Sequence, residues 1–314
     1  MAAGANIDTG LVPLFTTQFS TNLELLLQQS GSVLRGKVRE GVHVGKMASP
    51  INQMGAVSVK APQGRFTPKK RTDAEFVRRW VFPHPGEIDQ LIDGFDELQT
   101  IVNPKSEYGT NAANAFGRFW DDGLIAAATG TASLGEDAGS LTNETFNTTN
   151  FQIPVTFGTG GAASGLTVEK IKEARRILKK YHNNLDQDRP TLVIGSQQDS
   201  DLLSLVQVVS TEFNDRPVLV DGKVKQFLGF DIAESERLPF SRGAANQRGV
   251  LAFVKTGLYL GLWKEVTSRA SIRNDLTSEP WDLYTSSMFG ATRTQPGKVL
   301  EILCSDTTGA DITP

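Results

Sequence analysis

Cysteine and long apolar runs are nearly absent from this chain of 314 residues. The single cysteine, Cys304, excludes an intramolecular disulfide and leaves no thiolate cluster for a structural zinc. Ile302 and Leu303 precede it, which predicts a buried and inert thiol. No stretch approaches the roughly 18 apolar residues of a membrane span, and residues 1–15 lack a basic segment followed by an apolar one, so we expect no signal peptide and no membrane contact. The protein should therefore be made in the cytoplasm.

Histidine and catalytic motifs are equally scarce. The three histidines, His43, His84 and His182, stand too far apart in sequence to suggest a metal site, and neither H-E-x-x-H nor G-x-S-x-G occurs. With one cysteine and no motif that places a base beside a nucleophile, nucleophilic catalysis has no candidate residues. The sequence therefore predicts no catalytic, metal-binding or cofactor-binding site, and a protein that is not an enzyme.

Positive charge is not in excess either. The net charge is −3 and the sequence pI is about 5.7, which argues against a broad basic face for nucleic acid. Any contact with a nucleic acid should be local or weak.

One glycine-rich segment offers the best signal for an enzyme. Residues 151–178 read as a strand, a turn rich in glycine and a helix, which is the layout of a phosphate-binding loop. However, Leu166 stands where such a loop needs lysine, and the strand after the helix ends in V-I-G-S, without an acidic residue for a ribose hydroxyl. A nucleotide-binding enzyme that uses the Gly158–Gly165 loop is therefore the weaker alternative.

Two long helices are expected. Asn103 followed by Pro104 marks a helix start, and small and aromatic residues recur behind it at helical spacing, so a helix is predicted over about 104–130. A second helix is predicted over 167–182, with Thr167 as N-cap and lysines in the last turn. Upstream, an amphipathic element within 1–36 has too few apolar partners to fold alone. It packs either on its own domain or, as an arm, on a neighbouring subunit.

Residues 38–82 follow a β pattern interrupted by glycine and proline. Between two of the predicted strands lies a turn-rich basic run, residues 62–72. Its cations are Arg65, Lys69, Lys70 and Arg71. Such a run is either a solvated loop tip or the tip of an extended hairpin that pairs its cations with carboxylates of an adjacent subunit.

The last third of the chain carries the most informative pattern. Segments 226–239, 252–266 and 284–302 follow one another, with strand-like alternation in the first two, and segments 118–130 and 166–180 precede them. As an ordered set they resemble the major capsid proteins of tailed bacteriophages, whose shells have the Hong Kong 97-type fold. The resemblance implies an α+β fold with an N-terminal arm, an extended hairpin called the E-loop, a peripheral domain with a long spine helix, and an axial domain.

The same resemblance implies five segments. The N-terminal arm is 1–37, and the E-loop hairpin is 38–84. The peripheral domain is 85–190 and contains the spine helix and the second helix. Residues 191–275 are mainly the axial domain, and residues 276–314 return to the peripheral domain and end in a tail.

A structural role follows from the resemblance. The chain is expected to assemble in the host cytoplasm, as hexamers and pentamers, into the icosahedral head of a virion that encloses double-stranded DNA. An encapsulin-type compartment, which shares the fold, is the alternative. No fused scaffolding region is seen in the sequence, so the expected partners are a separate scaffolding protein and a portal protein, with a decoration protein as an open option.

Two sets of residues are candidates for structural contacts. Those expected to form ion pairs between subunits are Arg65, Lys69, Lys70, Arg71, Arg78 and Arg79. Those expected to hold the peripheral domain together are Arg118, Asp121, Asp122, Phe289, Gly290 and Arg293. In the second set, Arg118 can reach Asp121 or Asp122 because helical residues three or four apart are neighbours.

Overall fold

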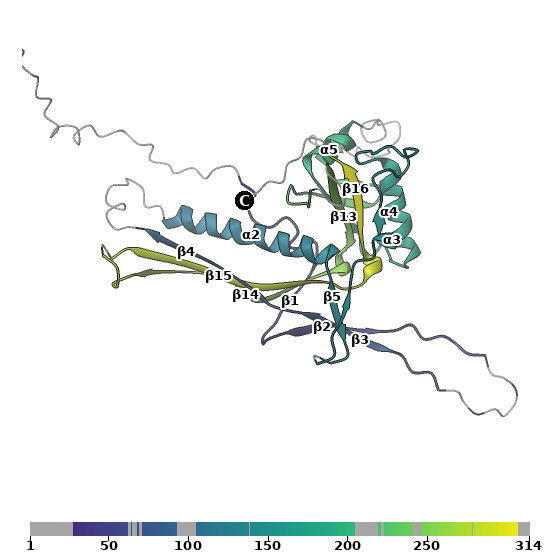
Figure 1. Ribbon diagram of the computed structural model, residues 1–314, viewed down its shortest axis with the longest axis horizontal. Helices are drawn as coiled ribbons and strands as arrows, with labels where there is room; N and C mark the ends of the chain where they lie inside the picture. Colours follow the sequence, from purple (N-terminus) through teal and green to yellow (C-terminus); the bar gives the residue numbers. More distant parts are fainter. Residues whose placement is uncertain are drawn as a thin grey trace, which may run out of the picture. The chain divides into compact units, whose positions relative to one another are not determined.

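The computed structural model in Figure 1 describes residues 28–61, 64, 68, 71–92, 105–137, 139–204, 219–220, 223–240, 246–277 and 279–306. Within these residues the helices are α2 (Lys105–Thr129), α3 (Thr148–Phe151), α4 (Val168–Lys180) and α5 (Ser196–Leu203). The helices predicted over about 104–130 and 167–182 are α2 and α4. The predicted arm is outside the described residues except for 28–37.

A six-stranded sheet forms the largest part of the core. Its strand order is β11 (Gln226–Phe227), β12 (Phe230–Glu234), β8 (Pro190–Ile194), β13 (Gln247–Val254), β16 (Val299–Ser305) and β7 (Gln152–Ile153). The central strand β13 is antiparallel to both of its neighbours, and every residue from Arg248 to Val254 is buried. Both faces of this strand are therefore covered, which explains its unbroken apolar run Val250–Val254.

Two further sheets have four strands each. One has the order β1 (Arg39–Val42), β14 (Leu258–Ile272), β15 (Trp281–Arg293) and β4 (His84–Ile92). The other has the order β2 (Ala48–Met54), β3 (Phe76–Val81), β5 (Ala132–Gly135) and β6 (Thr142–Glu144). A short pair, β9 (Leu219–Val220) with β10 (Lys223–Val224), completes the strands. In this part of the chain two 3₁₀ turns, Lys255–Gly257 and Pro296–Lys298, precede β14 and β16.

The chain divides into two compact units. Within the described residues, the smaller unit takes its strands and helix from Ile88–Ala112 and Ser268–Thr285. The larger unit takes its elements from Gln29–Glu87, Ala113–Thr267 and Ser286–Pro314. All the contacts discussed below lie inside the larger unit.

The strand pairing joins segments from several of the predicted regions. Strand β16 comes from the segment 276–314, which was expected to return to the peripheral domain and end in a tail, and it pairs with β13 from Val299 to Ser305. Helix α4, from the predicted peripheral domain, packs against β16 and β7. The predicted domain bounds stay a prediction, and local sequence patterns do not reveal such long-range backbone pairs.

Helix α2 makes one unusually close approach. A Cβ atom added to Gly117 would lie 2.4 Å from the carbonyl carbon of Gly31, so the backbone of the last part of the predicted arm lies directly on the helix. Asn114 supports this contact, since its side-chain oxygen accepts a hydrogen bond from the Gly31 amide at 3.1 Å. Only glycine permits this approach.

Gly117→Ala should therefore destabilise the protein by about 1–3 kcal/mol, because the methyl group must displace a neighbouring backbone segment. Gly109 is the matched control on the same helix, since a Cβ there meets nothing within 4 Å. Gly109→Ala should stabilise the helix by about 0.5–1 kcal/mol. Thermal unfolding of the two variants checks this, and shifts of the melting temperature in the same direction would contradict the close approach.

Candidate assembly hairpin and its anchor

The hairpin predicted as an E-loop begins with β2 and β3. These strands pair antiparallel from Ala48 with Val81 to Met54 with Phe76, and the Gly55 amide donates one further hydrogen bond to the Glu75 carbonyl at 2.7 Å. Beyond this point β2 and β3 have ended, and the described chain on either side continues without forming a ladder (Figure 1). The sequence pattern of 38–82 is thus a hairpin with a paired root and an unpaired extension.

The unpaired extension is exposed and partly apolar. Every residue from Met54 to Ala61 is exposed, and Val59 is 100% exposed. Met54, Val57 and Phe76 are also exposed. Apolar side chains gathered in this way on an extended segment mark a surface that another protein covers.

The predicted inter-subunit cations separate into three groups. Arg65, Lys69 and Lys70 lie outside the described residues. Arg71 is exposed and makes an ion pair with Asp73 at 2.9 Å, and Arg78 is exposed on β3. Arg79 differs from them, because its side chain is buried and forms an ion pair with Glu144 of the same chain. Its place as an inter-subunit candidate is therefore not supported by the structure, since its buried side chain is not open to a second subunit.

Arg79 belongs to an anchor at the root of the hairpin. Its Nε also donates to the Gln53 side chain at 3.5 Å, and the Gln53 amide donates to the Thr294 carbonyl at 2.9 Å. On β3, the Trp80 indole N–H donates to the Gly135 carbonyl at 3.1 Å. These bonds tie the hairpin strands to β5 and β6 of the same sheet and to Thr294, which directly follows β15.

Arg293 completes this anchor from the other side. It is 0% exposed, and its Nη1 donates to the carbonyls of Ala128 and Gly130 at 3.0 and 2.9 Å. These are carbonyls at the C-terminus of α2, which lack partners within the helix. Nη2 donates to the Glu144 carbonyl at 3.2 Å. Burial lowers the pKa of Arg293, and Arg79 acts in the same direction while Glu144 opposes it.

Asp121 holds the last part of the predicted arm, residues 29–34. Its carboxylate is fully buried and accepts hydrogen bonds from the Gln29 side chain at 2.7 Å, from the Ser32 hydroxyl, and from the backbone amides of 33–34 at 2.9 and 3.2 Å. Arg118 donates to the Gln29 carbonyl at 3.1 Å. Both residues of the spine helix thus fix the point from which the upstream chain departs.

The remaining peripheral candidates also have internal contacts. Asp122 receives a two-pronged ion pair from Arg237, whose pKa it raises. Phe289 is buried and packs edge-on against Phe119, with ring centroids 4.9 Å apart. A Cβ on Gly290 would lie 2.3 Å from the Phe82 carbonyl oxygen, so the chain passes closely there.

The groups of the glycine-rich loop that could bind a phosphate already have hydrogen-bond partners within the protein. The Leu166 amide, which a phosphate would need, donates to the Asp201 carboxylate at 2.9 Å. Lys170 is buried, and its ammonium donates to the backbone carbonyls of Ser164, Gly165 and Leu303 at 2.8 to 3.0 Å. The Asp201 carboxylate occupies the place that a phosphate would take and repels it. All three N–H donors of Lys170 are already used. The loop therefore disfavours nucleotide binding.

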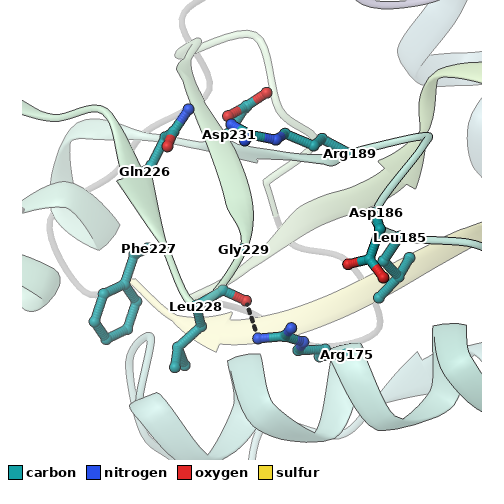
Figure 2. Close-up of a pocket in the computed structure, with 9 residues that line it drawn as sticks. All are labelled: Arg175, Leu185, Asp186, Arg189, Gln226, Phe227, Leu228, Gly229 and Asp231. Carbon is teal, nitrogen blue, oxygen red and sulfur yellow. Dashed lines mark hydrogen bonds between the residues drawn. The ribbon is translucent and has the colours of Figure 1, made fainter.

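A surface pocket of about 460 Å³ lies beside α4 (Figure 2). Arg175 donates to the Leu228 carbonyl at 2.8 Å and so fixes the β11–β12 turn, in which Leu228 and Gly229 have φ values of 48° and 83°. The lining mixes charges of both signs with apolar groups: Arg175, Leu185, Asp186, Arg189, Gln226, Phe227, Leu228, Gly229 and Asp231. Small-molecule sites are mostly apolar with few polar groups, and this pocket differs from them.

Neither a metal site nor a membrane helix is found in the part of the chain that the structure describes. No group of three or more histidine, cysteine, aspartate and glutamate residues there could hold a metal ion. Within the same residues, every helix is too short or too polar to cross a bilayer.

A family model for phage capsid proteins matches residues 12–306. The chain belongs to the phage capsid protein family. Members of this family are structural proteins of virions, so the predicted structural role is confirmed. A comparison with curated proteins gives no match.

Solved capsid structures show the same fold. The capsid of cyanophage P-SCSP1u has a TM-score of 0.70 at 16% identity, over 97% of each chain. The cyanophage Pam1 capsid has a TM-score of 0.68 at 12% identity, over 96% of this chain and 100% of the other. Mycobacterium phage Che8 has a TM-score of 0.65 at 16% identity, over 91% and 96%. The resemblance to tailed-phage major capsid proteins and the Hong Kong 97-type α+β fold are thus confirmed.

Several contacts of the anchor were not identified from the sequence. Gln53 lies in the predicted β region 38–82, Glu144 lies outside every predicted strand and helix, and Arg237 shows no motif that points to Asp122. Their partners are at least 26 residues away in the chain. Only the alternation of the hairpin strands gave a local signal.

Proposed function

We propose that this capsid protein assembles as hexamers and pentamers into an icosahedral phage head that encloses double-stranded DNA, and that it acts without catalysis. The observation that carries this proposal is the exposed apolar extension of the β2–β3 hairpin on a firmly anchored root. A chain that worked alone would gain nothing from exposing Met54, Val57 and Val59. A neighbouring subunit in a shell would cover them.

The mechanism is association. Each subunit supplies a large and partly extended surface, and closure of a symmetric shell makes many weak contacts jointly stable. In this proposal residues 1–37 act as the arm and 38–84 as the E-loop. The hairpin cations then pair with carboxylates of an adjacent subunit.

The proposed partners follow from this role. A separate scaffolding protein sets the size of the head, a portal protein occupies one vertex, and packaged DNA fills the interior. Contacts with DNA should be local, because the chain has a net charge of −3. Assembly would take place in the host cytoplasm, and a decoration protein is a further candidate partner.

Electron microscopy of the purified protein, produced with its scaffolding and portal proteins, tests the proposal. We expect closed shells with five-fold and six-fold capsomers, and nuclease-protected DNA in particles from infected cells. Subunits that never form particles would overturn the shell role. Particles filled with an enzyme and lacking DNA would favour the encapsulin alternative.

A further inference from the structure

Two short runs of this chain share a pattern and a high exposure. One is Val42-His43-Val44, at the end of β1, where Val42 is 78% exposed and Val44 is 93% exposed. The other is Val57-Ser58-Val59, on the hairpin extension. Valine is a strong strand former because its branched side chain packs well on a pleated surface. Both runs therefore have the composition of a strand and expose the side chains that a strand would bury.

The first run lies on an open sheet edge. Strand β1 is the outermost strand of its sheet, with β14 on one side and no strand on the other among the described residues. The His43 amide donates inward to the Leu262 carbonyl at 2.9 Å. Backbone groups alternate in direction along a strand, so those of Val42 and Val44 point outward. An edge of this kind is a template for another strand.

The second run is a strand without a partner. Residues 56–61 make no backbone hydrogen bond to the other described residues, although the sequence alternates as a strand does. Its two valines share one face, and Ser58 and Lys60 share the other. No described strand of the same chain pairs with it, and the β1 edge is likewise uncovered by the described residues, so a second copy can supply the partner for each.

We propose that segment 56–61 of one subunit adds as an antiparallel strand to the β1 edge of a second copy, with Val57 opposite Val44 and Val59 opposite Val42. This inference rests on the proposed shell and names the backbone contact by which the hairpin binds its neighbour. Strand addition of this type gains main-chain hydrogen bonds for affinity and side-chain matching for register.

The antiparallel direction is favoured because antiparallel ladders are slightly more stable per residue than parallel ones. In that register Lys60 lies opposite Gly41, so no charged side chain directly faces it across the strand pair.

Engineered disulfides test the register. The native thiol gives no background, because Cys304 is buried and its burial raises its pKa to about 12. We expect assembled Val44→Cys/Val57→Cys shells, after mild oxidation, to give a ladder of covalent multimers on a non-reducing gel. The matched control, Val44→Cys/Ser58→Cys, moves the thiol by one residue to the opposite face and should give only monomer.

The other outcomes are equally distinct. A ladder from Val44→Cys/Val59→Cys and none from the 44/57 pair would show a parallel register and overturn the proposal. A disulfide within one chain, or shells without any ladder, would overturn it too while leaving the shell function intact. If wild-type protein forms no shells, the proposed function itself fails.

If the cysteine variants do not assemble, hydrogen exchange on wild-type shells provides a second test. In wild-type shells the amides of Val42 and Val44, and alternate amides of 56–61, should exchange at least ten times more slowly than in unassembled subunits. Unchanged exchange in both segments would overturn the strand addition. Protection of 42–44 without protection of 56–61 would show that another segment, such as residues 1–27, covers the edge.

Discussion

Reversing the four cations of the hairpin to glutamate should abolish shell formation and leave the subunit folded. The variant replaces Arg65, Lys69, Lys70 and Arg71. Exposed ion pairs contribute about 0–1 kcal/mol each, so their loss should hardly change the melting temperature of the subunit. In a shell, however, the reversal places glutamates beside the carboxylates that the cations are proposed to meet. The repulsion then recurs at every copy of the interface.

Salt distinguishes this effect from misfolding. The Debye length falls from about 10 Å at 0.1 M salt to about 3 Å at 1 M, so high salt should restore part of the assembly. Electron microscopy and sedimentation at both salt concentrations provide the measurement. Normal shells from the variant at low salt would show that these cations are merely solvated and take no part in assembly.

A second set of cations serves as the control. Lys172, Lys179, Arg189 and Lys225 are exposed on other parts of the chain, and their reversal changes the net charge by the same amount. We expect this control to form shells at low salt. If both variants fail alike, the overall negative charge is the cause and the hairpin has no special role.

Local patterns in the sequence predicted the helices well. The N-cap side chain of Thr167 accepts the Lys170 amide, and α4 ends in the expected lysines. The 25 residues of α2 lie within the predicted range. Capping and helical periodicity act over a few residues, so a sequence displays them directly. The hairpin root was visible for the same reason, since strand alternation has a period of two.

Those local patterns did not predict the long-range contacts. The pairing of β16 with β13 was not predicted, because it joins segments about fifty residues apart. Arg79 looked like one more hairpin cation, and only the fold reveals Glu144 beside it. Asp121 was expected to pair within its helix and instead holds the segment before β1 through several hydrogen bonds. Burial of charge depends on which segments meet, and composition does not encode that.

Arg293→Met should cause the largest loss of stability among single substitutions at the anchor. Methionine fills a similar volume but donates no hydrogen bond, so the carbonyls of Ala128, Gly130 and Glu144 lose a donor together. An orphaned buried polar group costs about 1–3 kcal/mol. Gly130 and Glu144 are partly exposed and can recover water, so we expect a total loss of about 3–5 kcal/mol.

Urea unfolding of the unassembled subunit measures this loss. Arg176→Met is the matched control, because the Arg176 side chain is 63% exposed and pairs with Glu173 on its own helix. That control should unfold as the wild type does. Arg293→Lys should fall between the two, since an ammonium keeps the charge but lacks the planar fork that reaches three carbonyls. Equal midpoints for Arg293→Met and wild type would refute the anchor.

The same substitution should also loosen the hairpin. Arg293 and Arg79 both bond to Glu144, one to its carbonyl and the other to its carboxylate, so loss of Arg293 weakens the strand on which Arg79 depends. Limited proteolysis should then cleave the segment that joins β2 (48–54) to β3 (76–81) several times faster than in wild type. A hairpin that moves at its root cannot present the 56–61 segment in one register to a neighbour. We therefore expect shells of Arg293→Met to form poorly even at temperatures where the subunit remains folded.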